Sequence, residues 1–341
     1  MVLCFGELLL RMSPTLEREW IVQHKMPVYI GGAELNVASA LARWKVPVQY
    51  FTTLPDNYLS AEITAEIVSG GINISNTKYS GERIGIYYLP QGADLRNKGV
   101  IYDRAYSSFA GLQPGEIDWD KVLKDCTWFH FSAISPALSQ NIADVCREGL
   151  QAASARKLTI SVDLNYRSKL WKYGKKPVEI MPGLVSHCNV IMGNLWSAAE
   201  LLGIEVDKDI HQQGSREAYI LHAKRTADHI IKKYPQCKTV ANTFRFDAGD
   251  GIRYFATLDE QNGQVVSPLF ETASVVDRVG SGDCFMGGLI YGLYNNHGAQ
   301  DVIDFAAAAA FGKLQERGDA TSQTIDDIKS ILGKEWTETK A

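Results

Sequence analysis

The chain has 341 residues, of which 45% are hydrophobic and 22% charged, which is typical of a globular protein with a large core. Its net charge of −4 and the lack of a long basic tract argue against a nucleic-acid-binding protein. Apolar runs are shorter than the ~18 residues of a transmembrane span, which argues against a membrane protein.

The cysteines and the first residues of the chain indicate the cellular compartment in which the protein is found. Six cysteines are scattered without a C-x-x-C pair, and several lie in apolar runs, which predicts buried, reduced thiols. The opening "MVLCFGELLL" lacks a basic leader and contains Glu7, so it does not resemble a signal peptide. We therefore expect a cytoplasmic protein.

The first elements are a short strand and a helix. Residues 2–6 form a buried-strand pattern, and "GGAELNVASALARW" (31–44) opens with a Gly-Gly turn and continues as an Ala/Leu-rich helix. This succession of strand, glycine turn and helix is typical of the start of an α/β domain.

Residues 81–111 lack helical periodicity. They are predicted to form two strands joined by a polar turn, and residues 11–30 have a similar character. We infer a small β-sheet subdomain, built from about 11–30 and 81–111, inserted into a single domain of residues 1–341. Aromatic and basic side chains crowd it and favour a lid over a substrate cleft. A meander without catalytic role, or a dimer contact, is the alternative.

The rest of the chain alternates strands and helices. The expected elements are strands at 127–135, 158–165, 188–194 and within 246–258, and helices at 138–156, just after 194, and near 284–296 and 300–316. Strands separated by helices predict βαβ units and a mostly parallel, Rossmann-type sheet flanked by helices. Ligands bind such sheets at the carboxyl ends of the strands.

"DRVGSGDCFMGG" (277–288) combines a glycine-rich turn with an acidic residue at the start of an apolar helix. Gly280 and Gly282 allow unusual backbone conformations and leave room for a ligand. The N-terminus of the helix would attract a phosphate, and Asp283 could accept a proton from an attacking hydroxyl. The alternative is an ordinary turn with Asp283 as the helix N-cap.

Two motifs together resemble the signatures of the ribokinase-like, or phosphofructokinase-B, sugar kinases. The first is the early Gly-Gly turn followed by an asparagine. The second is D-T-x-G-A-G-D-x-F-x-G-G, which this chain matches at Asp277, Gly280, Gly282, Asp283, Phe285, Gly287 and Gly288, with Ser281 in place of alanine. The resemblance covers nearly the whole chain.

The resemblance implies a ribokinase-like core with a β-sheet lid and transfer of the γ-phosphoryl group of ATP to a sugar hydroxyl. It implies that Asp283 is the general base and that the turn from Gly280 through Ser281 and Gly282 to Asp283 forms an anion hole. It also implies that Gly31, Gly32 and Asn36 bind sugar hydroxyls. Mg²⁺ would be held mainly by the phosphates, without a dedicated protein metal site.

Three further stretches resemble the group of this family that phosphorylates 2-keto-3-deoxygluconate. They are "RIGIYYLPQG" (83–92), "VIYDRAYSS" (100–108) and "DLNYRSKLW" (163–171), with matches at Tyr87, Tyr102, Arg104 and Arg167. A sugar acid carries a carboxylate, which arginine binds bidentately and tyrosine can hydrogen-bond. Alternatively, Arg104 pairs with the lid surface or a second subunit, Arg167 is anchored on Asp163, and Tyr88 rather than Tyr87 faces the cleft.

The nucleotide side departs from the family. Ser197 stands where the family has a glutamate after Asn194, and Thr243, Phe244 and Arg245 stand where glycine is expected. The nucleotide-binding candidates are Asn194, Thr243, Gly249 and Gly251. These departures suggest an altered metal shell, another nucleotide preference or weak activity.

We therefore expect an ATP- and Mg²⁺-dependent kinase for the 6-hydroxyl of 2-keto-3-deoxygluconate. A kinase for a neutral ketose such as fructose or for another sugar acid is the first alternative. A non-catalytic sugar- or nucleotide-binding protein is the second. The resemblance favours a homodimer formed through the lid.

Overall fold

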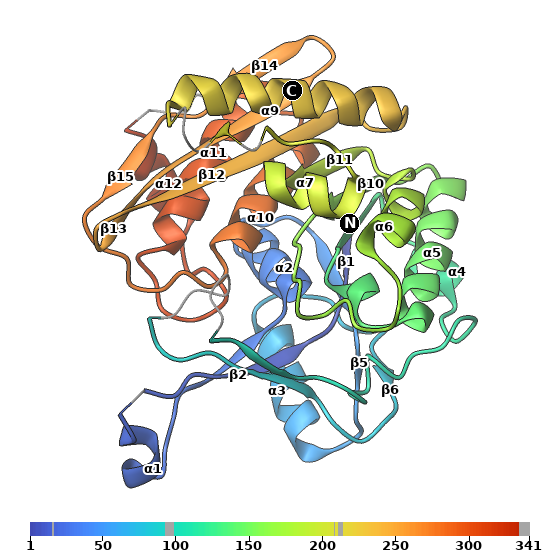
Figure 1. The fold of residues 1–341 in the computed structure, drawn as a ribbon. Helices are drawn as coiled ribbons and strands as arrows, with labels where there is room; N and C mark the ends of the chain where they lie inside the picture. The colour runs from blue at the N-terminus through green and yellow to red at the C-terminus, as the bar shows by residue number, and fades with distance from the viewer. Residues whose placement is uncertain (16, 93–98, 208, 211–213, 334–341) are drawn as a thin grey trace.

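A nine-stranded sheet forms the centre of the protein in the computed structural model, which describes residues 1–15, 17–92, 99–207, 209–210 and 214–333 (Figure 1). The strand order is β14-β13-β12-β11-β10-β9-β1-β4, and β15 also pairs with β13. Strands β4 to β12 along this order are parallel, whereas β13 pairs antiparallel with β12, β14 and β15. The strands are β1 (Val2–Phe5), β4 (Val48–Phe51), β9 (Trp128–Ser132), β10 (Thr159–Asp163), β11 (Val190–Gly193), β12 (Thr239–Ala248), β13 (Gly251–Glu260), β14 (Gly263–Val266) and β15 (Phe270–Thr272).

Helices cover both faces of this sheet (Figure 1). In β1, Val2 and Cys4 belong to one buried apolar cluster and Leu3 and Phe5 to another, as expected for side chains that alternate across a sheet. The first cluster contains residues of α2 (Ala33–Arg43), α3 (Tyr58–Ser69), α10 (Ser281–Tyr294), α11 (Ala299–Lys313) and α12 (Ile325–Leu332). The second contains residues of α4 (Trp119–Val122), α5 (Gln140–Ala155), α6 (Pro177–Val185), α7 (Leu195–Leu202) and α9 (Arg216–Lys233).

A second, four-stranded sheet has the order β3-β2-β7-β8 and consists of β2 (Leu9–Met12), β3 (Val28–Gly31), β7 (Gly85–Tyr88) and β8 (Ile101–Asp103). Strands β2 and β7 are parallel, and the other two pairs are antiparallel. Three residues separate β1 from β2, so the chain passes directly from the core sheet into this one. Helix α1 (Glu19–Gln23) extends away from the body (Figure 1).

The remaining elements are a two-stranded sheet of β5 (Thr53–Leu54) and β6 (Lys78–Tyr79) and a short 3₁₀ helix, η1 (Ser135–Ala137). In the described part of the chain, no helix is both long and apolar enough to cross a membrane.

The predicted α/β class with a mostly parallel sheet is confirmed, and so is the burial of the thiols. All six cysteines are buried and unpaired. The strand predicted within 246–258 is found as β13, which begins at Gly251 after a short turn. Residues 246–248 belong instead to β12, which pairs with β13 along its whole length. Residues 16 and 93–98, which belong to the predicted lid segments, lie outside the described residues.

Candidate active site

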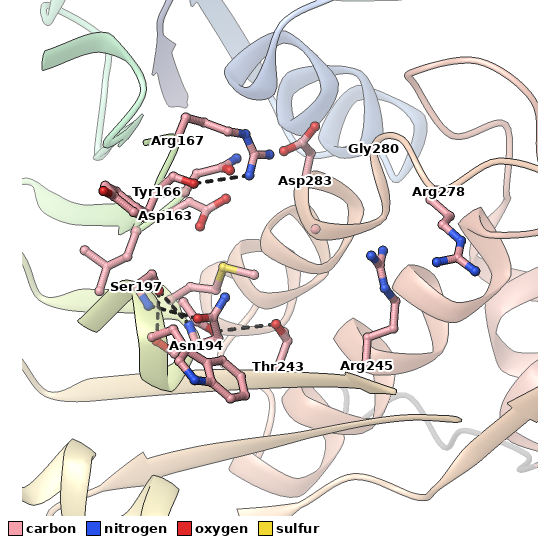
Figure 2. Close-up of a pocket in the computed structure, with 16 residues that line it drawn as sticks. Asp163, Tyr166, Arg167, Asn194, Ser197, Thr243, Arg245, Arg278, Gly280 and Asp283 are labelled. Carbon is pink, nitrogen blue, oxygen red and sulfur yellow. Dashed lines mark hydrogen bonds between the residues drawn. The ribbon is translucent and has the colours of Figure 1, made fainter. Parts of the chain in front are cut away.

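Two cavities meet at the carboxyl ends of the parallel strands. The first, of about 370 Å³, lies beside β10, β11, β12 and the start of α10 (Figure 2). It is lined by Asp163, Leu164, Asn165, Tyr166, Arg167, Met192, Gly193, Asn194, Trp196, Ser197, Thr243, Arg245, Arg278, Gly280, Gly282 and Asp283. The position is the one expected for a ligand site in an open α/β sheet.

The second cavity, of about 50 Å³, lies between the four-stranded sheet and the core. Its lining residues are Leu9, Gly32, Ala33, Asn36, Tyr87, Tyr102, Arg104, Ile134, Asn165, Arg167, Val279 and Asp283. Asn165, Arg167 and Asp283 line both cavities. A group passing from one cavity to the other would therefore pass these three side chains.

The turn before α10 depends on glycine. Gly280 precedes the first helical residue with φ 78°, and a Cβ added to it would lie 2.0 Å from the backbone oxygen of Asp319. An added Cβ on Gly282 would meet nothing within 4 Å, so its hydrogen leaves space in the cavity that it lines. The free N–H groups of the first turn of α10 make this end of the cavity favourable for an anion.

Unlike Gly280, Gly282 and Asp283, Ser281 does not line the first cavity. Its hydroxyl donates to the Ala310 carbonyl oxygen of α11 at 2.9 Å, and its side chain does not line either cavity. The side chain thus ties the turn to the neighbouring helix.

Asp283 lies in the first turn of α10 and is buried. The N-cap is Gly280, so the alternative that Asp283 caps the helix is wrong. Its Oδ2 accepts a hydrogen bond of 2.7 Å from Nδ2 of Asn36. Burial raises the pKa of Asp283 to about 6, while the Asn36 hydrogen bond and the Arg167 charge act in the opposite direction.

Asn36 is fixed by the start of α2. Gly32 precedes this helix with φ 137°, and Glu34 in its first turn accepts hydrogen bonds from the backbone N–H (2.9 Å) and the hydroxyl (2.6 Å) of Ser132, at the end of β9. Burial raises the pKa of Glu34 to about 7. The Oδ1 atom of Asn36 is buried and has no hydrogen-bond partner within the described protein, and Asn36 lines the second cavity. A ligand hydroxyl could supply that partner.

Arg104 already has a carboxylate partner inside the protein. Its Nε donates to Oε2 of Glu7 at 2.7 Å, and its terminal nitrogen forms an ion pair with the same carboxylate. Glu7 also accepts a hydrogen bond from the Ser107 hydroxyl. Pairing with the lid surface or a second subunit was the expected alternative, but the partner is the segment that joins β1 and β2.

Arg167 lies four residues beyond the end of β10. Its described hydrogen bond goes to the Tyr166 carbonyl oxygen at 3.4 Å, and none of the ion pairs among the described residues includes it. Its charge nevertheless acts on two carboxyl groups. Burial raises the pKa values of Asp163 and Asp283, and the Arg167 charge acts in the opposite direction. Figure 2 shows the guanidinium directed toward Asp283. Of the two predicted arginines, Arg167 is the better placed to bind an external carboxylate.

On the four-stranded sheet, Tyr87 faces the cavity. Tyr87 is buried and lines it, while Tyr88 is partly exposed and does not. The hydroxyl of Tyr87 donates to Oδ1 of Asp319 at 2.8 Å. Gly31 lines neither cavity, because it packs against Asp319, where an added Cβ would lie 2.4 Å from Oδ1.

Asn194 and Ser197 cap the N-terminus of α7. The Asn194 Oδ1 accepts from the Ser197 N–H, and the Ser197 hydroxyl accepts from the Asn194 N–H, both at 2.9 Å. Both residues line the first cavity, as does Thr243, whose hydroxyl lies 3.5 Å from the Gly193 carbonyl oxygen. The serine found in place of the family glutamate therefore completes a capping box.

Gly249 and Gly251 are not brought to the site. They belong to the β12–β13 hairpin and line neither cavity. A Cβ added to Gly251 would lie 1.8 Å from the Thr272 backbone oxygen, so packing against the neighbouring strand accounts for this glycine.

Two arginines of the first cavity were not predicted from the sequence to bind a ligand. Arg245 and Arg278 both line it and extend toward each other from β12 and from the segment before α10 (Figure 2). Arg278 also pairs with Asp247 at 2.8 Å. Side chains two residues apart in a strand point to the same face of the sheet, so the predicted role of Thr243 could have indicated Arg245 as well. Together with the start of α10, these cations suit a polyphosphate.

No group of three or more His, Cys, Asp or Glu side chains among the described residues is arranged to hold a metal ion. Asp163 and Asp283 are the carboxylates that line the first cavity. Burial, and after it the Asp283 charge, raises the pKa of Asp163.

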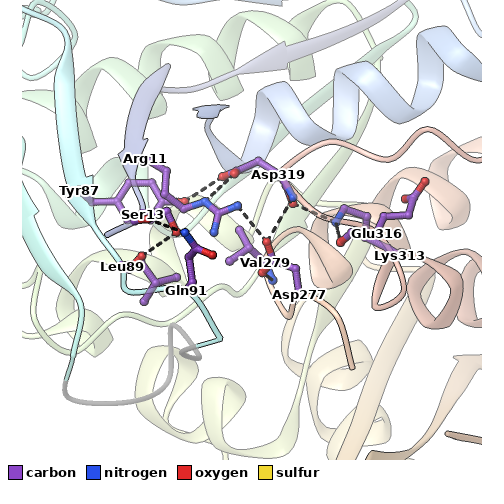
Figure 3. A network of polar contacts seen from close by, with 11 residues as sticks. Arg11, Ser13, Tyr87, Leu89, Gln91, Asp277, Val279, Lys313, Glu316 and Asp319 are labelled. Carbon is purple, nitrogen blue, oxygen red and sulfur yellow. Dashed lines mark hydrogen bonds and ion pairs between the residues drawn. The ribbon is translucent and has the colours of Figure 1, made fainter. Parts of the chain in front are cut away.

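A further network links the four-stranded sheet to the turn before α10 (Figure 3). Arg11 of β2 donates to Asp319 at 2.7 Å and to Asp277 at 3.0 Å. Asp277 in turn accepts from the N–H groups of Val279 and Gly318, at 3.0 and 3.2 Å. Of these side chains only Asp277 lies in a motif noted in the sequence, so Arg11 and Asp319 were missed.

The pattern of the "pfkB family carbohydrate kinase" matches residues 1–326. The 2-dehydro-3-deoxygalactonokinase of Haloferax volcanii is 29% identical over 330 residues, which cover 96% of this chain and 95% of the relative. The solved 2-dehydro-3-deoxygluconokinase of Thermotoga maritima is 33% identical, with a TM-score of 0.87 over 98% of this chain and 99% of the other.

A fructokinase of Xylella fastidiosa, solved with bound ATP, shares the fold. Its TM-score is 0.73 at 19% identity, and the match covers 97% of this chain and 98% of the other.

Proposed function

Because the chain belongs to the pfkB family of carbohydrate kinases, we propose that it transfers the γ-phosphoryl group of ATP to the 6-hydroxyl of 2-keto-3-deoxygluconate. The observation that carries the choice of a sugar acid is the position of Arg167, which lines both cavities and has no ion-pair partner among the described residues. Two similar proteins bear the names of kinases for such acids, one for the gluconate (2-dehydro is another word for 2-keto) and one for its galactonate epimer.

In the proposed reaction, the sugar acid occupies the second cavity and Mg·ATP the first. Asp283, where the cavities meet, accepts the proton of the attacking 6-hydroxyl. Asn36 holds the Asp283 carboxylate through Nδ2 and offers its unpartnered Oδ1 to the sugar. Gly32 and the ring of Tyr87 shape the cavity, and Arg167 binds the carboxylate with help from Tyr102 and the Glu7-paired Arg104.

On the nucleotide side, the N–H groups from Gly280 to Asp283 would stabilise the phosphoryl group in transit. Arg245 and Arg278 are suited to the remaining phosphates, and Asn194, Ser197 and Thr243 line the same cavity. Magnesium bound to the phosphates of the nucleotide would neutralise part of their charge.

The four-stranded sheet is proposed to act as the lid of the sugar cavity, within one domain. Its β3 and β8 expose Val28 and Ile101, which are 52% and 62% accessible, and α1 exposes Val22 nearby in sequence. These apolar side chains support a homodimer through the lid, which the molecular mass in solution tests. The six buried, unpaired thiols support a cytoplasmic location.

The function is tested by ADP release with Mg·ATP and a panel of 2-keto-3-deoxygluconate, its galactonate epimer, gluconate, fructose and ribose. We expect turnover on the keto-deoxy acids and none on fructose or ribose, which lack the carboxylate that Arg167 would bind. Gluconate has the same carboxylate and 6-hydroxyl, so its turnover tests whether the 2-keto and 3-deoxy groups are needed. Turnover confined to fructose or ribose would contradict the sugar-acid substrate and favour the neutral-sugar alternative. Binding of ATP without ADP release from any compound would favour a non-catalytic protein.

The pH dependence follows from the pKa of Asp283, which is raised to about 6. The base must be ionised, so kcat/KM is expected to fall about tenfold per pH unit below pH 6 and to level off above pH 7. Phosphates of ATP titrate in the same range. Asn36→Ala distinguishes titration of Asp283 from titration of ATP. Loss of the hydrogen bond that lowers the Asp283 pKa should move the acidic limb of the kcat/KM profile to higher pH. A limb that stays in place in this variant would assign the titration to the nucleotide.

A further inference from the structure

Lys313 is a fully buried lysine at the end of α11, with 0% of its surface exposed. Lysine is almost never buried without compensation. Its Nζ donates to the backbone oxygens of Gly318 at 2.9 Å and Glu316 at 3.2 Å. The ammonium group is thus held by main-chain carbonyl oxygens of the loop that follows α11 (Figure 3).

Lys313 lies among charged side chains. The carboxylates of Asp277, Asp319 and Glu316 act on it, and Arg11, which pairs with Asp277 and Asp319, is a second cation. Burial lowers the pKa of Lys313, and the charges of Asp277 and Glu316 act in the opposite direction.

The lysine lies directly behind the turn proposed to hold the phosphoryl group. A Cβ added to Gly280 would lie 3.4 Å from Cε of Lys313 and 2.0 Å from the backbone oxygen of Asp319. Asp277, at the other side of the turn, accepts the Gly318 N–H. The loop 316–319 is therefore in contact with the turn 277–283, and the ammonium group holds that loop.

Carbonyl and carboxylate oxygens are also the ligands that a potassium ion takes. We propose that the Lys313 ammonium is a built-in monovalent cation: it holds the 316–319 loop and thereby the Gly280–Asp283 turn, so turnover needs no dissolved potassium or ammonium ion. Lys313 is a positioning residue, because it lines neither cavity and acts through the turn. This inference rests on the kinase reaction proposed above.

The experiment compares wild type, Lys313→Ala and Lys313→Met in a buffer whose only monovalent cation is tetramethylammonium. Lys313→Ala removes the cation and leaves a space beside the carbonyl oxygens, whereas Lys313→Met fills that space with an apolar chain. Both should lose roughly 10–100-fold in kcat, because the donors of the anion hole are no longer held in place. Potassium, ammonium or n-propylammonium should restore much of the activity of Lys313→Ala and little of that of Lys313→Met.

Wild type should show the same turnover with and without these ions. The surface variant Lys233→Met, which removes another lysine bonded to a backbone carbonyl oxygen (Leu202, 2.8 Å), should behave like wild type. Stimulation of wild type several-fold by potassium would overturn the inference, as would equal rescue of both Lys313 variants.

A readout without turnover separates this inference from the kinase reaction. The Tm of Lys313→Ala should rise with potassium or ammonium but not with tetramethylammonium, and the Tm of wild type should not respond. A wild type that lacks kinase activity would contradict the proposed function, while this ion-specific shift would still test the role of Lys313. Absence of the shift in folded Lys313→Ala would overturn the inference, and if that variant does not fold, the response of wild type to potassium decides.

Discussion

Asp283→Asn is expected to lower kcat by roughly 10²–10⁴, the usual contribution of a positioned general base. The amide keeps the size of the carboxyl group and leaves the Gly280 turn unchanged, but it cannot take a proton from the 6-hydroxyl. The sugar should bind nearly as well as to wild type, since Asn36 and Arg167 remain in place. Single-turnover phosphorylation and sugar binding measured by calorimetry separate the two effects.

Asp259→Asn is the matched control. Asp259 is another buried aspartate whose pKa burial raises to about 6, but it lies in β13 and lines neither cavity. Its variant should keep kcat within about twofold, because surroundings alone do not make a base. A near-normal kcat for Asp283→Asn would remove Asp283 as the base. A similar loss of kcat in both variants would mean that the loss results from lower stability of the folded protein.

Arg167→Ala is expected to reduce kcat/KM for 2-keto-3-deoxygluconate by roughly 10²-fold, the cost of losing a bidentate, charge-assisted contact. The same change should matter much less for any residual turnover of fructose, which has no carboxylate. Initial rates across the substrate panel measure both quantities.

Arg167→Lys refines this result. It keeps the charge but loses the planar pair of donors, so an intermediate loss is expected if the carboxylate is bound bidentately. Equal losses on the acid and on fructose would mean that Arg167 acts on Asp163 and Asp283 rather than on the substrate. A mild effect of Arg167→Ala on the acid would transfer the recognition to Arg104 and Tyr102.

The sequence allowed the fold to be predicted because its signals are local. The strand at 158–165 and the helix at 138–156 are periodic segments of ordinary length, and both were found within a few residues of their bounds. The turn before α10 was found for the same reason: its glycines and Asp283 lie within a few positions of one another.

The supporting contacts of the site could not be predicted, because their partners are distant in sequence. Arg11 and Asp319 are 308 residues apart, and Arg104 and Glu7 are 97 apart. Each residue alone is an ordinary charged side chain, and only the fold brings it to its partner. The prediction that Gly249 and Gly251 bind the nucleotide was wrong for another reason. Closely spaced glycines occur both in hairpins and in phosphate-binding loops, so the sequence does not distinguish the two.

The six buried cysteines give this enzyme a set of internal chemical reporters. Burial raises the pKa of each thiol, so a disulfide reagent in solution should react only after the surrounding element has opened. Cys284 is the most informative of them, because it directly follows Asp283 in the first turn of α10. Its labelling rate, followed by mass spectrometry of the modified peptides, records how often the phosphate-side turn opens. The other five cysteines provide the internal standard for opening of the core.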